Sequence, residues 1–239
     1  MALTDNIVAY WKLDESSGNA SDSVGSVTLT NTGSTYVAGK INNGISFGSS
    51  SDNTNTMVNG SVGGALLNLA NGSAKSISFW IKANANPNTG NNRCIDFRRS
   101  STSAGELSIN YFQSGSDYQF SFYVNGGTLT AYVANLSVGT WYHFVMTVDS
   151  SDNITVYLNN SSVRTGTWGS AGSGSNFTQV GGANGSSGSF CAPVAIDEFG
   201  CWNKELDSGE VSELYNGGMG LQYPFPSLVK GGTLSMMGV

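Results

Sequence analysis

The chain has 239 residues, which suits one large all-β domain or at most two small domains. Hydrophobic residues make up 39% of it and aromatic residues 11%, which is enough to bury a core, so disorder is excluded as the default. Only 11% of the residues are charged and the net charge is −6, which excludes nucleic acid as a partner because phosphate binding needs a basic surface.

Short segments rich in β-branched and aromatic residues follow one another, separated by Gly, Ser and Asn turn clusters. Residues 7–13 (IVAYWKL) form the first expected strand. The clearest hairpin joins residues 141–149 (WYHFVMTVD) to residues 154–160 (ITVYLNN) through the turn at Ser150–Asn153. Many short strands of this kind predict a sandwich or a barrel. The other expected strands lie in VTLTNT, GISF, SISFWIKA, CIDFR, ELSINYFQ, YQFSFYV, LTAYVANL, FTQVGG and VAIDEFGCW.

One helix is predicted, at residues 207–216. Asp207 is suited to the N-cap, and Glu210 stands three residues later, as in a capping box. An apolar face follows at helical spacing, and Gly217 is expected to end the helix. This face consists of Val211, Leu214 and Tyr215.

Five segments carry a family resemblance, in this order along the chain: VAYWKLDESSGNASDSVGS, GKINNGISF (39–47), SISFWIKA, GTWYHFVMTVDSSDNITVYLNN and IDEFGCWNKELDSGEVSELYNGG. Together they resemble the laminin-G-like, concanavalin A-like lectin and glucanase domains, over residues 6–218. The resemblance implies a two-sheet antiparallel jelly-roll sandwich. It also implies that the terminal strands lie together and that the short C-terminal helix closes one edge.

The resemblance divides the chain into a domain at residues 1–223 and a tail at residues 224–239. Pro224 and Pro226 remove two backbone donors, and the apolar residues beyond them have no partner segment of their own. Exposed apolar surface of this extent favours contact with another surface. We therefore expect the tail to be an assembly arm, with a homo-oligomer as one outcome.

The resemblance also implies a structural Ca²⁺ near the joined termini. Calcium takes oxygen ligands from irregular loops, and the loop GNASDSVG offers Asn19, Asp22 and the carbonyl group of Gly25. Asp197 in the last strand is the expected partner of Asp22. In the alternative, Asp22 caps its own turn and Asp197 forms a hydrogen bond or an ion pair.

Catalysis is not expected. Glycosidases need two carboxylates that act on the same glycosidic bond. Strict alternation in the last strand places Ala195, Asp197 and Phe199 on one face and Glu198 on the other, so the adjacent carboxylates do not converge. His143 is the only histidine, which excludes a His-rich metal site. The sequence therefore predicts a protein that is not an enzyme.

Carbohydrate binding usually combines an exposed aromatic ring with amide, carboxylate or guanidinium groups for the hydroxyls. Trp168, in the loop RTGTWGSAGSGSN, is the best candidate for an exposed ring. Tyr118, Asp96 and Arg98 come next. In the alternative, Trp168 is a loop aromatic that covers an edge of the core.

These observations favour a non-catalytic, lectin-like recognition or surface module that contacts glycans or other surface proteins. The N-terminus has no basic and apolar leader, and no apolar run reaches 18 residues, so membrane insertion is not expected. A fold of extracellular type without a leader suggests a bacteriophage virion protein, such as a capsid decoration, a fibre or a tail adhesin. The alternatives are a carbohydrate-binding module of a larger secreted or cell-surface protein and, third, a glycoside hydrolase.

Overall fold

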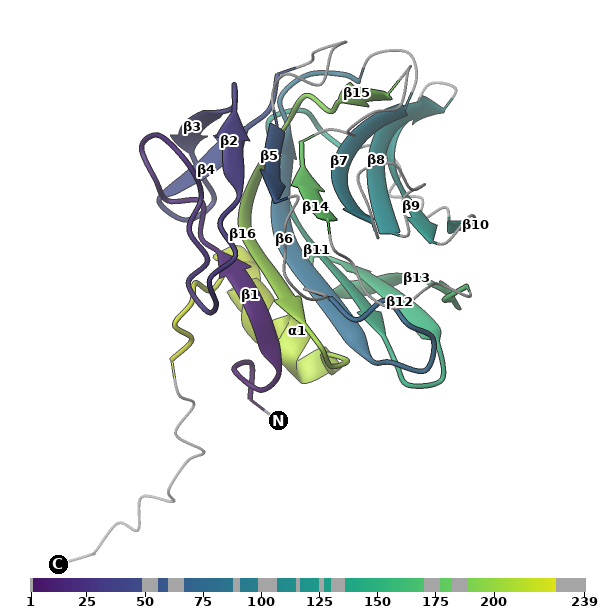
Figure 1. The fold of residues 1–239 in the computed structure, drawn as a ribbon. Coiled ribbons are helices and arrows are strands. Elements are labelled where there is room, and N and C mark those ends of the chain that lie inside the picture. Colours follow the sequence, from purple (N-terminus) through teal and green to yellow (C-terminus); the bar gives the residue numbers. More distant parts are fainter. Residues whose placement is uncertain are drawn as a thin grey trace, which may run out of the picture.

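The computed structural model describes residues 2–48, 56–59, 67–87, 91–98, 107–114, 117–124, 127–129, 136–169, 177–181 and 189–226. These residues form two eight-stranded sheets that stack as layers (Figure 1). The first sheet runs in the order β13-β12-β11-β6-β16-β4-β3, with β1 also paired to β16. The second runs in the order β10-β9-β8-β7-β14-β5-β2, with β15 also paired to β7. The two-sheet sandwich predicted from the sequence is confirmed.

The first sheet contains β1 (Ile7–Trp11), β3 (Thr35–Ala38), β4 (Asn43–Ser46), β6 (Lys75–Ala83), β11 (Trp141–Val148), β12 (Asn153–Leu158), β13 (Ser161–Thr167) and β16 (Val194–Trp202). The second contains β2 (Thr30–Thr32), β5 (Thr56–Asn59), β7 (Asn91–Arg98), β8 (Leu107–Ser114), β9 (Asp117–Val124), β10 (Gly127–Leu129), β14 (Phe177–Val180) and β15 (Ser189–Cys191). The described strand pairs are antiparallel except β15 with β7, which is parallel.

Two strand pairings, one local and one between the ends of the domain, define the topology of the first sheet. The predicted hairpin is present, with Phe144 of β11 opposite Leu158 of β12. The terminal strands also pair as expected, since Trp11 of β1 lies opposite Phe199 of β16 (Figure 1). The last strand thus lies in the middle of the first sheet, between β6 and β4.

The main core lies between the sheets and is built from alternate residues of both. Phe199 occupies its centre. Its ring centroid lies 5.2 Å from that of Trp11, 6.2 Å from that of Phe79 and 6.0 Å from that of Phe97. Phe79 belongs to the first sheet and Phe97 to the second, so Phe199 links the two layers. Burying a side chain of this size stabilises the fold by roughly 1.5–3 kcal/mol.

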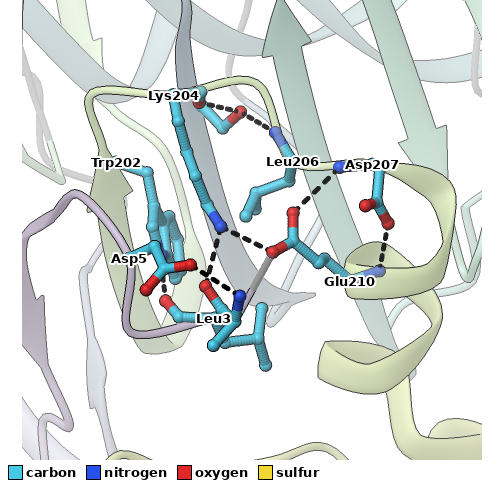
Figure 2. Close-up of polar contacts among 9 residues, drawn as sticks. Leu3, Asp5, Trp202, Lys204, Leu206, Asp207 and Glu210 are labelled. Atoms are coloured by element: carbon cyan, nitrogen blue, oxygen red, sulfur yellow. Dashed lines mark hydrogen bonds and ion pairs between the residues drawn. The ribbon is translucent and has the colours of Figure 1, made fainter.

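The helix α1 (Ser208–Tyr215) begins at the predicted capping box. Asp207 Oδ1 accepts from the backbone N–H of Glu210 at 2.9 Å, and the Glu210 carboxylate accepts from the backbone N–H of Asp207 at 3.1 Å (Figure 2). Glu210 also accepts from Lys204 Nζ at 2.5 Å. The helix ends at Asn216, a left-handed C-cap, one residue before the predicted Gly217. A 3₁₀ turn, η1 (Asn216–Gly218), follows.

The position of the helix differs from the implied closure of a sheet edge. Val211 and Leu214 are buried in a second apolar cluster with Tyr10, Val145 and Trp202. Those three strand residues point away from the main core, so the helix covers the outer face of the first sheet. A sheet with apolar residues on both faces needs a cover on both, which explains why the helix lies on a face.

The segment up to Phe225 continues to cover the outer face of the first sheet, past the predicted domain boundary at residue 223. Phe225 is 8% exposed and packs edge-on against Tyr10, with 5.4 Å between the ring centroids. The packed domain therefore includes Phe225. Residues 227–239 lie outside the described part of the chain, so the role of the tail in assembly stays a prediction. Within the described part, no helix is long and apolar enough to cross a membrane.

Candidate functional site

Asp22, the first expected calcium ligand, holds its own loop together. Its carboxylate accepts three backbone N–H groups, from Tyr10 at 3.0 Å, Val24 at 2.9 Å and Val27 at 3.2 Å. A Cβ atom at Gly25 would lie 2.7 Å from Asp22 Oδ2, so glycine lets the loop approach this carboxylate closely. These contacts are those of the alternative reading, in which Asp22 caps its own turn.

The other expected calcium ligands are also engaged by backbone donors. Asp197 Oδ2 accepts from the N–H groups of Lys40 at 2.7 Å and Ile41 at 2.9 Å, and Oδ1 accepts from the N–H of Glu198 at 2.9 Å. Asn19 Oδ1 accepts from a backbone N–H at 3.0 Å.

A calcium ion needs carboxylate lone pairs that face it, whereas N–H hydrogens repel a cation. Both oxygens of Asp22 and both of Asp197 accept from backbone N–H donors. The described residues contain no group of three or more His, Cys, Asp or Glu side chains suited to a metal ion. Calcium binding by Asp22 and Asp197 stays a prediction.

A β-bulge in β16 overturns the strict alternation expected for the last strand. The register with β6 shifts between Asp197 and Gly200, and Glu198 adopts a left-handed φ of 50°. As a result Ile196 and Phe199, three residues apart, both point into the main core. The predicted shared face of Ala195, Asp197 and Phe199 is therefore wrong.

The bulge places both carboxylates on the helix-covered face of the first sheet. Asp197 lies opposite Trp80, whose ring stacks on Tyr215 of α1 with 5.9 Å between centroids. Glu198 Oε2 accepts from Tyr10 Oη at 2.5 Å, and Oε1 accepts from Gln222 Nε2 at 2.6 Å. The prediction that the two side chains point to opposite faces is wrong for the same reason.

Burial is the main cause of the pKa shifts of Asp197 and Glu198. It raises the pKa of Asp197 to about 9, although three backbone N–H donors favour the ionised form. It raises the pKa of Glu198 to about 7, against the hydrogen bonds from Tyr10 and Gln222. Asp197 is 0% exposed and Glu198 is 3% exposed. Their oxygens serve internal contacts, which anchor β16 to the β3–β4 turn and to the chain end.

Trp168 is buried, so the expectation of an exposed stacking ring is wrong. It is 2% exposed, and its Nε1–H donates to the carbonyl oxygen of Leu69 at 3.0 Å. Lys75 Nζ lies 4.4 Å from the ring centroid, in a cation–π contact. The alternative reading, a loop aromatic that covers the core edge, matches this packing.

The remaining predicted sugar contacts are spread along the second sheet. Tyr118 is half-buried against the main core, with its ring centroid 6.4 Å from that of Tyr111. Asp96 is fully buried, and its Oδ2 forms an ion pair with Arg93 Nη1 at 2.8 Å. Arg98 is the last residue of β7, and its side chain lies outside the described part of the chain. Of these three residues, Asp96 is thus held in an ion pair within the second sheet, and Tyr118 packs partly against the core.

A set of mostly buried polar side chains, here called the polar face, lies on the outer side of the second sheet. Alternate residues of β8 and β9 fill the main core, including Ile109, Tyr111, Phe120 and Phe122. The residues between them point away from that core. The polar face comprises Arg93 and Asp96 of β7, Ser108, Asn110 and Phe112 of β8, and Gln119 and Ser121 of β9.

Strand register brings these side chains into adjacent rows. Asn110 lies opposite Arg93 on one side and opposite Ser121 on the other. The next row pairs Phe112 with Gln119. Directly opposite residues on one sheet face have Cβ atoms roughly 4.5–5.5 Å apart, so neighbouring side chains in a row are in reach of each other.

Several polar atoms of this face are buried without a hydrogen-bond partner among the residues that the structure describes. Asn110 and Gln119 are 2% and 4% exposed, and neither Asn110 Oδ1 nor Gln119 Oε1 has such a partner. Arg93 Nε has none there either. Arg93 and Phe112 are half-buried, so the buried amides adjoin a guanidinium and an aromatic ring that are partly exposed.

The sequence does carry a signal for this face. In SINYF (108–112) and QFS (119–121), polar Ser, Asn and Gln alternate with the aromatic and aliphatic residues of the core. An exposed loop tryptophan does not mark this face, because its aromatic residue is a phenylalanine inside a strand. Alternation alone also does not show which amides lack internal partners.

The architecture is that of a concanavalin A-like β-sandwich. The chain belongs to the laminin-G branch of the concanavalin A-like lectin/glucanases superfamily, whose family model matches residues 59–212. No curated protein matches the chain in sequence.

Solved structures share the fold at low sequence identity. The binding domain of Paraclostridial Mosquitocidal Protein 1 is 16% identical (TM-score 0.66), with 91% of this chain and 53% of that chain covered. Trypanosoma rangeli sialidase in complex with sialic acid is 14% identical (TM-score 0.67), with 91% and 34% covered. Domain 4 of AbnA, a GH43 extracellular arabinanase from Geobacillus stearothermophilus, in complex with arabinotriose, is 18% identical (TM-score 0.61), with 90% and 98% covered. The chain thus spans about half of the first of these chains and a third of the second.

Proposed function

We propose that the protein is a non-catalytic carbohydrate-binding module and that the polar face is its sugar site. The observation that carries this proposal is the two buried amide oxygens, of Asn110 and Gln119, that have no partner among the described residues and lie next to a half-buried aromatic ring. A buried polar atom without a partner costs about 1–3 kcal/mol. A ligand hydroxyl at this face would remove that cost.

The side chains of the face have complementary tasks. Phe112 offers a ring on which the C–H face of a sugar can stack, and Gln119 lies directly opposite it in the next strand. Asn110 lies one row further, beside Arg93. A sugar placed over Phe112 therefore has amide groups and a guanidinium within reach of its hydroxyls.

The comparisons are compatible with this class of function. One similar sandwich, which covers 90% of this chain, is a domain of an arabinanase in complex with arabinotriose, and another is the binding domain of a mosquitocidal protein. These likenesses concern the fold. The proposal for this chain depends on its own polar face.

The test is calorimetric titration of the chain with a panel of oligosaccharides. Phe112→Ala should weaken binding about two- to tenfold, because an aromatic contact of about 0.5–1.5 kcal/mol is lost. Asn110→Ala should weaken it as well. The matched control is Val163→Ala, at a 39% exposed position on β13 of the other sheet, which should bind as the wild type does. Binding that is equal in all three variants contradicts the assignment of the site.

We further propose that the module acts on the surface of a bacteriophage virion, as a decoration, fibre or tail adhesin. A sandwich with few charges and a sugar-binding face suits attachment to cell-surface glycans. Mass spectrometry of purified particles tests this placement. Recovery of the chain within a secreted polysaccharide-degrading protein would instead support the second candidate, a carbohydrate-binding module of a larger secreted or cell-surface protein, which the likeness to the arabinanase domain favours.

The absence of catalysis is also part of the proposal. The two adjacent carboxylates of β16 are buried and engaged by internal donors. Incubation with arabinan, galactan and β-glucan should yield no reducing ends. Turnover that disappears in Asp197→Asn would contradict this part of the proposal.

A further inference from the structure

We infer that the polar face selects neutral sugars over sugars that carry a carboxylate, such as sialic or uronic acids. This inference rests on the proposed function and adds the chemical class of the ligand. It depends on two features of the face: an ion pair that is complete within the protein, and amide groups that need a ligand able to donate hydrogen bonds.

The first feature is the pairing of Arg93. A guanidinium is the group that proteins commonly use to bind a carboxylate. Here Arg93 Nη1 already contacts Asp96 Oδ2 at 2.8 Å, and Asp96 is 0% exposed. An acidic sugar would have to share the guanidinium with a buried carboxylate of the same charge, and that repulsion is strong where water is excluded.

The second feature is the unpartnered acceptors. Asn110 Oδ1 and Gln119 Oε1 have no partner among the described residues, and as acceptors they need a ligand group that donates a hydrogen bond. A sugar hydroxyl donates and accepts, so it can serve these oxygens and also accept from Arg93 Nε–H. An ionised carboxylate only accepts, so a sugar that placed its carboxylate against these oxygens would leave them unsatisfied.

The polar face therefore discriminates between neutral and acidic sugars through its internal ion pair and its amide acceptors. Selectivity of this kind arises because the wrong ligand leaves buried polar groups unpaired. The half-buried ring of Phe112 offers stacking to the C–H face of either class of sugar, so the discrimination depends on the ion pair and the amides.

The experiment titrates the full chain with two matched sets of probes: arabinotriose and maltotriose as neutral sugars, and sialyllactose and trigalacturonate as acidic sugars. Wild type should bind at least one neutral probe about tenfold more tightly than either acidic probe, a difference of about 1.4 kcal/mol. Asp96→Asn removes the internal counter-charge of Arg93, so it should raise the affinity for acidic probes.

Tighter binding of an acidic probe by wild type, lost in Arg93→Gln, would overturn the inference and leave the proposed function standing. If no probe binds, or if binding is unchanged by Phe112→Ala, the proposed function fails and this inference fails with it. Circular dichroism establishes that each variant is folded. Should Asp96→Asn not fold, the order of affinities in wild type and in Arg93→Gln, at a half-buried position, decides the question.

Discussion

Glu210 holds the start of the terminal helix, and its removal gives the sharpest stability prediction. Its carboxylate accepts from Lys204 Nζ at 2.5 Å and from the backbone N–H of Asp207 at 3.1 Å (Figure 2). The Lys204 and Glu210 side chains are only 6% and 4% exposed. Removing one partner of a buried ion pair costs about 3–5 kcal/mol, because the other charge is left uncompensated.

Lys204 keeps one contact in the Glu210→Ala variant, to the carbonyl oxygen of Ala2 at 2.8 Å. We therefore expect the free energy of unfolding to fall by about 3 kcal/mol, the low end of that range. Chemical denaturation with urea, followed by tryptophan fluorescence, measures this change.

The matched control lies in the same helix. Glu213 is half-buried, and burial together with the nearby charges of Glu210 and Asp207 raises its pKa, so Glu213→Ala should be neutral or slightly stabilising. The double variant Lys204→Met with Glu210→Leu should recover most of the loss, because an apolar pair needs no compensation. A loss below about 1 kcal/mol for Glu210→Ala, or equal losses for both glutamates, would refute this reasoning.

Three further predictions concern the helix face, the buried carboxylates and calcium. Leu214→Ala should cost about 2–5 kcal/mol in urea denaturation, while Met219→Ala, at a 69% exposed position, should cost almost nothing. The folded-state pKa of Glu198 is raised from 4.5 to about 7, so its contribution to stability is full below pH 4.5 and is lost as the pH rises to about 7. Glu198→Gln should therefore flatten the fall in unfolding free energy over that window, and a parallel pH profile in the variant would speak against the shift. If Asp22 and Asp197 bind calcium, EDTA should lower the melting temperature and Asp22→Ala should remove that effect; an unchanged melting curve would favour the role of Asp22 as the acceptor of its own loop's N–H groups.

Local signals predict part of the fold, namely the helix start and the clearest hairpin. The Asp207 and Glu210 pair marks a capping box in any context, and the turn at Ser150–Asn153 predicts its hairpin from a few residues. The pairing of the first and last strands is not local, and it followed only from the family resemblance. The helix was placed on an edge because the sequence does not show that Tyr10 and Trp202 make the outer face of the first sheet apolar.

The candidate site was harder to predict, for two physical reasons. A β-bulge changes the sheet face of every later residue in the strand. The sequence DEFG (197–200) does not predict the left-handed φ of Glu198. The importance of Asn110 and Gln119 lies in the absence of internal partners, which depends on three-dimensional packing. The glycine-rich loop around Trp168 suggests an exposed ring, whereas the ring is buried and contacts Lys75 and a backbone carbonyl.

The most direct test of the account is a crystal structure of the full chain with a bound neutral trisaccharide. We predict a sugar ring stacked on Phe112, with hydroxyl groups within hydrogen-bond distance of Asn110 Oδ1 and Gln119 Oε1. A trisaccharide bound elsewhere, with Phe112 and both amides free of contact, would contradict the assignment of the polar face as the carbohydrate site.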